Sequence, residues 1–125
     1  MQYLKAYLNK IIERGNVKLA ESVSKTAEEV GEQHIRDFSF TSHEIGLLFG
    51  NVQSGKTGQM FGIMCKAADL GFPAFVLLTT DNVVLQQQTL DRVKADLDGF
   101  CICGENDARL FMDNSLLEPV IIVLK

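Results

Sequence analysis

Several residue types are scarce in this chain, and each scarcity argues against a class of protein. The 125 residues include no Trp, two Pro, two Tyr, two His and an odd number of cysteines, three. No apolar run approaches the ~20 residues of a membrane-spanning helix. The opening sequence MQYLKAYLNKII carries lysines inside its apolar stretch, which is unlike a secretory signal peptide. We therefore expect a cytoplasmic protein with reduced thiols and no membrane partner.

Basic residues are also fewer than acidic ones. Sixteen acidic residues outnumber twelve basic ones, and the formal net charge at pH 7 is −4. A protein that coats nucleic acid would be basic, so this class is not expected, although a local groove with few backbone contacts remains compatible. The apolar fraction of 46% and the charged fraction of 22% are ordinary for a globular protein. A chain of this length forms one domain at most.

The cysteines and histidines do not form a metal-binding pattern. Cys101 and Cys103 have no second pair and no nearby histidine, so a zinc site is not expected. We interpret them as alternate residues of a buried strand. His34 and His43 lack neighbours typical of catalysis, and we interpret both as surface or packing residues.

The most informative segment is IGLLFGNVQSGKT, residues 45–57. Its short apolar run ends before Gly50, and Gly55, Lys56 and Thr57 complete the phosphate-loop pattern G-x-x-x-x-G-K-[ST]. Gly50 allows a sharp turn out of a strand, and Gly55 lets the backbone approach a phosphate closely. The pattern requires a strand before it and a helix after it, and the flanking sequences predict both.

Each part of this loop has a predicted role. The backbone amides between Val52 and Thr57 can surround an anion at a helix N-terminus. Lys56 would contact the β- and γ-phosphates as the catalytic lysine, and the Thr57 hydroxyl would bind Mg²⁺. We therefore predict that ATP and Mg²⁺ are held by Gly50, Asn51, Val52, Gln53, Ser54, Gly55, Lys56 and Thr57.

The residues before Ile45 favour a helical extension. Apolar residues at helical spacing predict helices over 3–14 and 17–37, with a break at Gly15-Asn16 and a bend or an end at Gly31. We expect residues 38–44 to form a linker or a short edge strand.

From Ile45 onward, strand-like and helical patterns alternate, which predicts βαβ units and a parallel sheet. Gly71 and Pro73 are expected to stop the helix after the loop. The predicted strands are 45–49, 74–80, 100–103 and 120–124, and the predicted helices are 57–70, 83–97 and 106–117. The apolar character of VLL and VIIVL suits strands covered on both faces. The predicted domains are a helical extension, 1–44, and an incomplete nucleotide-binding domain, 45–125.

A second group of polar residues follows the predicted strand 74–80. Thr79, Thr80 and Gln88 would lie on the same rim as the phosphate loop, where hydroxyls and amides can contact a sugar–phosphate backbone. A structural alternative stays open, because either threonine, or Asp81, could instead cap the next helix.

From residue 45 to residue 125 the chain resembles the first lobe of superfamily-two helicase-like ATPases. Within that group, GNVQSGKT and the helix containing Leu85, Gln88 and Thr89 resemble restriction-associated, endonuclease-type members with a Z-one-type domain. The resemblance implies an α/β fold: a partial P-loop NTPase (RecA-like) three-layer sandwich with a parallel sheet and an N-terminal helical extension. It also implies a DNA-dependent ATPase in which Thr79, Thr80 and Gln88 contact nucleic acid.

Two elements of such ATPases are not found in the sequence. No apolar run ends in Asp-Glu, the acidic motif that holds Mg²⁺ and orients the attacking water, and there is no second lobe with an arginine finger. We therefore expect an ATP-binding fragment that is itself inactive, with an incomplete sheet edge through which copies could associate. The alternative is a nucleotide- or phosphate-binding regulatory or assembly module that does not hydrolyse ATP. A third possible function, which we rank last, is a small kinase-like or GTPase-like switch in which Asp81 is the acid that holds the metal.

Overall fold

The structure is a computed structural model that describes residues 2–48, 56–79, 83–104 and 118–124. The chain divides into two compact units, Met1–Gly71 and Phe72–Lys125. No helix among the described residues is long and apolar enough to cross a membrane. The domain boundary predicted after residue 44 is a different division of the chain from these two compact units. It stays a prediction.

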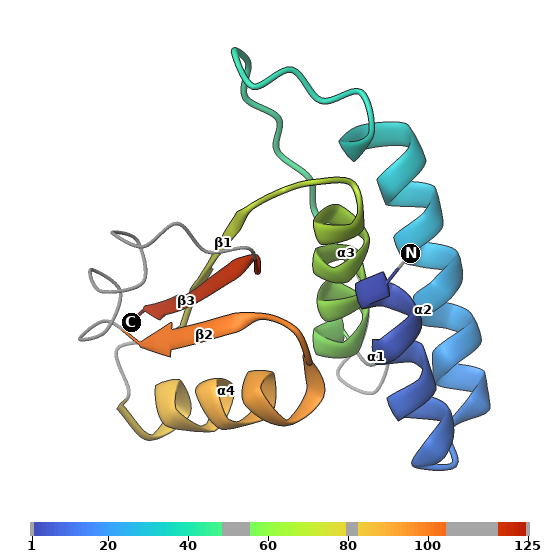
Figure 1. The fold of residues 1–125 in the computed structure, drawn as a ribbon, viewed down its shortest axis with the longest axis vertical. Helices are drawn as coiled ribbons and strands as arrows, with labels where there is room; N and C mark the ends of the chain where they lie inside the picture. Colours follow the sequence, from blue (N-terminus) through green and yellow to red (C-terminus); the bar gives the residue numbers. More distant parts are fainter. Residues whose placement is uncertain (1, 49–55, 80–82, 105–117, 125) are drawn as a thin grey trace. The chain divides into compact units, whose positions relative to one another are not determined.

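The first unit is helical (Figure 1). It contains α1 (Gln2–Glu13), α2 (Val17–Val30), the π-helical turn η1 (Gly31–Ile35) and α3 (Lys56–Asp69). The helices predicted over 3–14 and 57–70 are thus confirmed. Each helix turns its apolar stripe inward, as the helical spacing requires. The buried residues of α1 and α2 are Leu4, Tyr7, Ile11, Ala20, Val23 and Ala27.

Local chemistry explains the break between α1 and α2. Gly15 has a φ of 85°, a left-handed conformation that glycine adopts without steric cost. Asn16 is the N-cap of α2, and its side-chain oxygen accepts a hydrogen bond of 3.2 Å from the Leu19 backbone N–H. The predicted break at Gly15-Asn16 is confirmed.

The helix predicted over 17–37 is shorter than expected. Its α-helical part ends at Val30, and Gly31 begins the π-helical turn. Of the bend or end predicted at Gly31, the end of the α-helix is observed. Residues 38–44 form turns and irregular backbone rather than a strand. At the end of α3, Gly71 has a φ of 101°, in agreement with its predicted role as a helix stop.

The second unit contains a parallel sheet of three strands (Figure 1). These are β1 (Ala74–Leu78), β2 (Cys101–Gly104) and β3 (Val120–Leu124), in the order β1-β3-β2. Ala74 pairs with Val120 and Leu78 with Leu124, and both ladders are parallel. The central strand β3 is the most deeply buried. The predicted α/β class with a parallel sheet is confirmed for these strands.

Helix α4 (Val83–Asp96) connects β1 to β2 and packs against β2 and β3. This is the crossover helix that a parallel strand pair requires, and it confirms the helix predicted over 83–97. Leu97 and Phe100 are buried where the chain returns to the sheet. The Phe100 ring contacts Phe75 of β1 edge-on, with the ring centroids 6.1 Å apart.

The strand predicted over 45–49 is not formed in the described part of that segment. Residues 45–48 have no regular secondary structure, and Ile45 and Leu47 are exposed by 82% and 78%. An apolar sequence forms a strand only where a neighbouring strand completes its backbone hydrogen bonds, and the described strands pair with one another instead. Residue 49, the loop 50–55, Thr80, Asp81 and the helix predicted over 106–117 lie outside the described residues.

Candidate phosphate-binding helix

The first turn of α3 follows the predicted phosphate loop. Helix α3 begins at Lys56, the lysine of the G-x-x-x-x-G-K-[ST] pattern. Thr57 is half-buried and Gly58 is buried. The backbone N–H groups at the very start of any helix lack an intrahelical acceptor. The Lys56 side chain and the residues from Gly50 to Ser54 and Gly55 lie outside the described part, so their predicted roles stay predictions.

Gly58 allows a close contact between α1 and α3. The Tyr7 hydroxyl donates a hydrogen bond of 3.3 Å to the Gly58 carbonyl, and both groups are buried. A Cβ at position 58 would lie 3.4 Å from the Tyr7 oxygen. The Tyr7 ring also contacts Phe61 edge-on, with centroids 6.2 Å apart. Helix α1 therefore fixes the backbone of the first turn of α3 through one side chain.

Gln59 makes the corresponding contact with α2. Its side chain is 7% exposed, and its Nε2 atom donates a hydrogen bond of 2.8 Å to the Ser22 hydroxyl oxygen. Its Oε1 atom has no hydrogen-bond partner among the residues that the structure describes. A buried acceptor left in this state costs about 1–3 kcal/mol.

Farther along α3, Gly62 and Lys66 continue the same helix face at four-residue intervals. A methyl group at Gly62 would overlap the Cγ1 atom of Val23 on α2. Lys66 is 1% exposed, and a Cβ at Gly31 would lie 2.5 Å from its Cγ atom. The absence of side chains at both glycines lets α2 and η1 pack tightly on α3.

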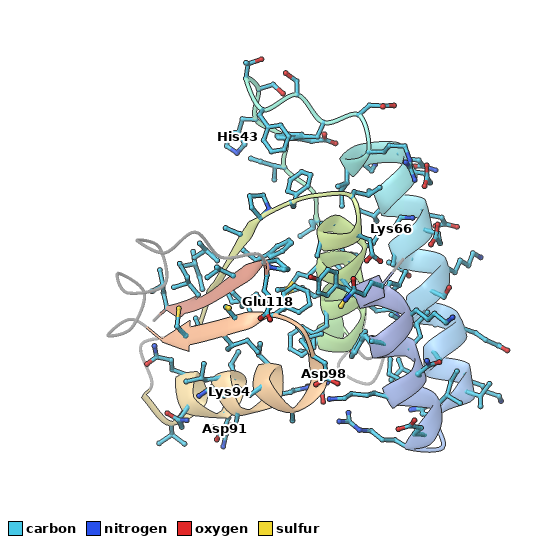
Figure 2. All side chains as sticks on the ribbon, viewed as in Figure 1. His43, Lys66, Asp91, Lys94, Asp98 and Glu118 are labelled. Carbon is cyan, nitrogen blue, oxygen red and sulfur yellow. The ribbon has the colours of Figure 1, made fainter. Side chains whose placement is uncertain are left out.

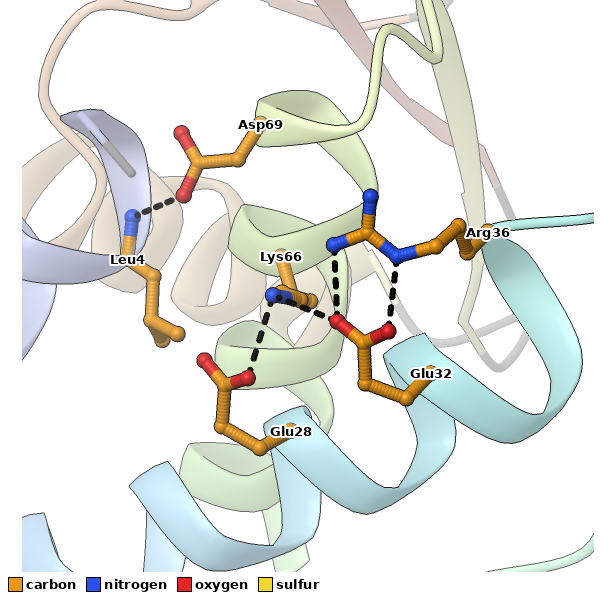
Figure 3. A network of polar contacts seen from close by, with 6 residues as sticks. All are labelled: Leu4, Glu28, Glu32, Arg36, Lys66 and Asp69. Atoms are coloured by element: carbon orange, nitrogen blue, oxygen red, sulfur yellow. Dashed lines mark hydrogen bonds and ion pairs between the residues drawn. The ribbon is translucent and has the colours of Figure 1, made fainter.

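The Lys66 ammonium ends in a network of charges (Figure 3). Its Nζ atom lies 3.1 Å from Oε2 of Glu28 and 3.4 Å from Oε1 of Glu32. Glu32 also accepts two hydrogen bonds from Arg36, of 2.6 and 2.7 Å. These bonds, together with the charges of Arg36 and Lys66, lower the pKa of Glu32 from 4.5 to about 2. The network joins α2 and η1 to α3, well away from the first turn.

At the last turn of α3, a carboxylate caps α1. Asp69 accepts hydrogen bonds of 2.8 and 3.2 Å from the backbone N–H groups of Tyr3 and Leu4. These are N–H groups without an intrahelical acceptor, and a negative charge at a helix N-terminus is favourable. Both ends of α3 are thus tied to the N-terminal helices.

The residues predicted to contact nucleic acid are only partly described. The Thr79 hydroxyl donates a hydrogen bond of 2.9 Å to the Leu124 carbonyl, and its backbone N–H bonds to the same oxygen. Thr79 therefore closes the ladder between β1 and β3. Gln88 is exposed on α4, and Thr80 lies outside the described residues. The outer side of α4 is mixed in charge, with exposed Asp91 and Lys94 (Figure 2).

The contacts of the cysteines and of His34 are those of structural residues. Burial raises the pKa of the Cys65 thiol to about 12, and none of the three cysteines forms a disulfide within the described residues. Burial, the hydrogen bond to Glu118 and the charge of that carboxylate raise the pKa of Cys101. His34 contacts Glu44 at 2.6 Å on the exposed surface. Within the described ranges, no three His, Cys, Asp or Glu side chains are placed to hold a metal ion.

Sequence reasoning missed the contacts of Tyr7, Ser22, Gln59 and Lys66. Tyr7 was expected on the apolar face of α1, but no pattern indicated what its hydroxyl binds. Gln59 and Lys66 are polar residues on a helix, where solvent exposure is the ordinary expectation. The four-residue register of Lys66 with Gly58 and Gly62 is a sequence signal that could have identified this face.

Comparisons with protein-family models, with curated proteins and with solved structures returned no match.

Proposed function

We propose that this chain binds the phosphates of ATP or ADP through residues Gly50 to Thr57. In this proposal it is the phosphate-binding part of a helicase-like, RecA-type ATPase. The observation that supports the proposal is that Lys56 and Thr57 of the motif lie in the helix α3. A phosphate loop needs its lysine near a helix N-terminus, where free backbone N–H groups and the helix dipole favour an anion.

Thr57 suits the predicted Mg²⁺ contact. It is half-buried in α3, directly after the motif lysine. Mg²⁺ in nucleotide sites takes one or two protein oxygen ligands, and phosphate oxygens and water complete its octahedron. One threonine hydroxyl is therefore a sufficient protein ligand for a Mg²⁺–nucleotide complex. When bound, the ion would neutralise phosphate charge.

The nucleic-acid part of the proposal rests on the resemblance to helicase-like ATPases and on the exposed position of Gln88. The Thr79 hydroxyl, whose hydrogen is donated to Leu124, keeps lone pairs that can only accept. It cannot donate to a DNA phosphate while that bond is present. Gln88, whose side chain is exposed on α4, is the stronger of the two for backbone contact.

Lys56→Ala tests nucleotide binding. Hydrogen bonds to charged groups contribute about 1.5–3 kcal/mol each, so loss of the lysine should weaken Mg²⁺–ADP binding at least ~10-fold. Isothermal calorimetry on the purified chain measures both affinities. Lys94→Ala is the control, because it removes an exposed lysine from α4, and its affinity should equal that of the unmodified chain. Equal ADP affinity in the Lys56→Ala variant would remove Lys56 from the site.

A further inference from the structure

We draw no further inference here: the strongest candidate, the exposed apolar side chains of Phe40, Ile45 and Leu47 in the segment that links η1 to α3, supports no proposal, because nothing in the described part of the chain shows what covers them.

Discussion

At the residue scale, Lys66 illustrates how a charge is accommodated inside a small protein. Its stem is packed against η1 at Gly31, while its ammonium reaches Glu28 and Glu32. The two glutamate side chains are 40% and 47% exposed, so the anions remain hydrated and only the lysine is withdrawn from water. Only the glutamates of these ion pairs are exposed, and Lys66 also contributes through the packing of its buried stem.

The pH dependence of stability follows from Glu32. Its pKa is lowered from 4.5 to about 2, first by the hydrogen bonds from Arg36. A carboxyl group with a lowered pKa in the folded state contributes stability above its unfolded pKa, and this contribution is lost as pH falls through the folded value. The unmodified chain should therefore lose this contribution between about pH 4.5 and pH 2. Glu32→Gln cannot titrate and should show a flatter acid limb.

Urea unfolding at a series of pH values measures this effect. Because Glu32 is exposed to solvent, added salt should reduce the difference between the two proteins. Glu29→Gln is a suitable control, since it removes a neighbouring exposed carboxylate of α2. Identical acid limbs for Glu32→Gln and the unmodified chain would show that the Arg36 contact does not persist in solution.

At the element scale, the packing of α2 on α3 depends on Gly62. Alanine is favoured over glycine inside a helix by about 1 kcal/mol, so Gly62→Ala would stabilise an isolated helix. Here the added methyl group would overlap Val23 Cγ1, a stiff β-branched side chain. Overpacking typically costs about 1–3 kcal/mol, and we expect Gly62→Ala to lower the free energy of unfolding on balance. Gly46→Ala, where an added Cβ has no atom within 4 Å, is the control.

Urea unfolding compares the two alanine variants. Gly46→Ala should unfold at nearly the same urea concentration as the unmodified chain, and Gly62→Ala at a lower one. A stabilised Gly62→Ala variant would mean that α2 and α3 do not pack as closely as the structure indicates.

The elements show which features could be predicted from the sequence. Helical spacing in α1, the stop at Gly71 and the apolar β3 are local patterns, and the predicted helices and the parallel pairing follow from them. The segment 45–48 has an equally clear apolar pattern but no strand, because a strand depends on a neighbour elsewhere in the chain.

In the candidate site, too, some features could be predicted from the sequence and others could not. The motif predicts a helix after the loop, since Lys56 and Thr57 belong to a short pattern with a mechanical basis, and both residues lie in α3. The burial of Gln59 and Lys66 could not be predicted, because it depends on Ser22 and Gly31, far away in the sequence. Long-range contacts of this kind are outside the range of any local pattern.

At the scale of the whole molecule, we expect ATP binding without appreciable hydrolysis by these 125 residues. Phosphoryl transfer needs a lysine, a metal ion, an acid that orients water and an arginine finger. The sequence contains the first of these and one hydroxyl for the metal, but no apolar run ending in Asp-Glu. A missing arginine finger alone reduces the rate by ~10³–10⁵-fold.

A phosphate-release assay with single-stranded and duplex DNA checks this expectation. Turnover should stay near background with either DNA. Sustained turnover near ~1 s⁻¹ that Lys56→Ala abolishes would show that the sequence does supply a catalytic acid. Asp81→Asn would then be the variant to make, because Asp81 follows the strand β1 within a few residues.

The central claim is that a nucleotide binds at the start of α3, and an NMR titration tests it most directly. In ¹⁵N-labelled chain, Mg²⁺–ADP should shift the backbone amide signals of Thr57, Gly58 and Gln59 in a saturable manner. Exposed amides of α4, such as those of Asp91 and Lys94, should not move, and Lys56→Ala should require at least ~10-fold more ADP for the same shifts. Saturable shifts confined to other parts of the chain, or none at millimolar ADP, would contradict the claim.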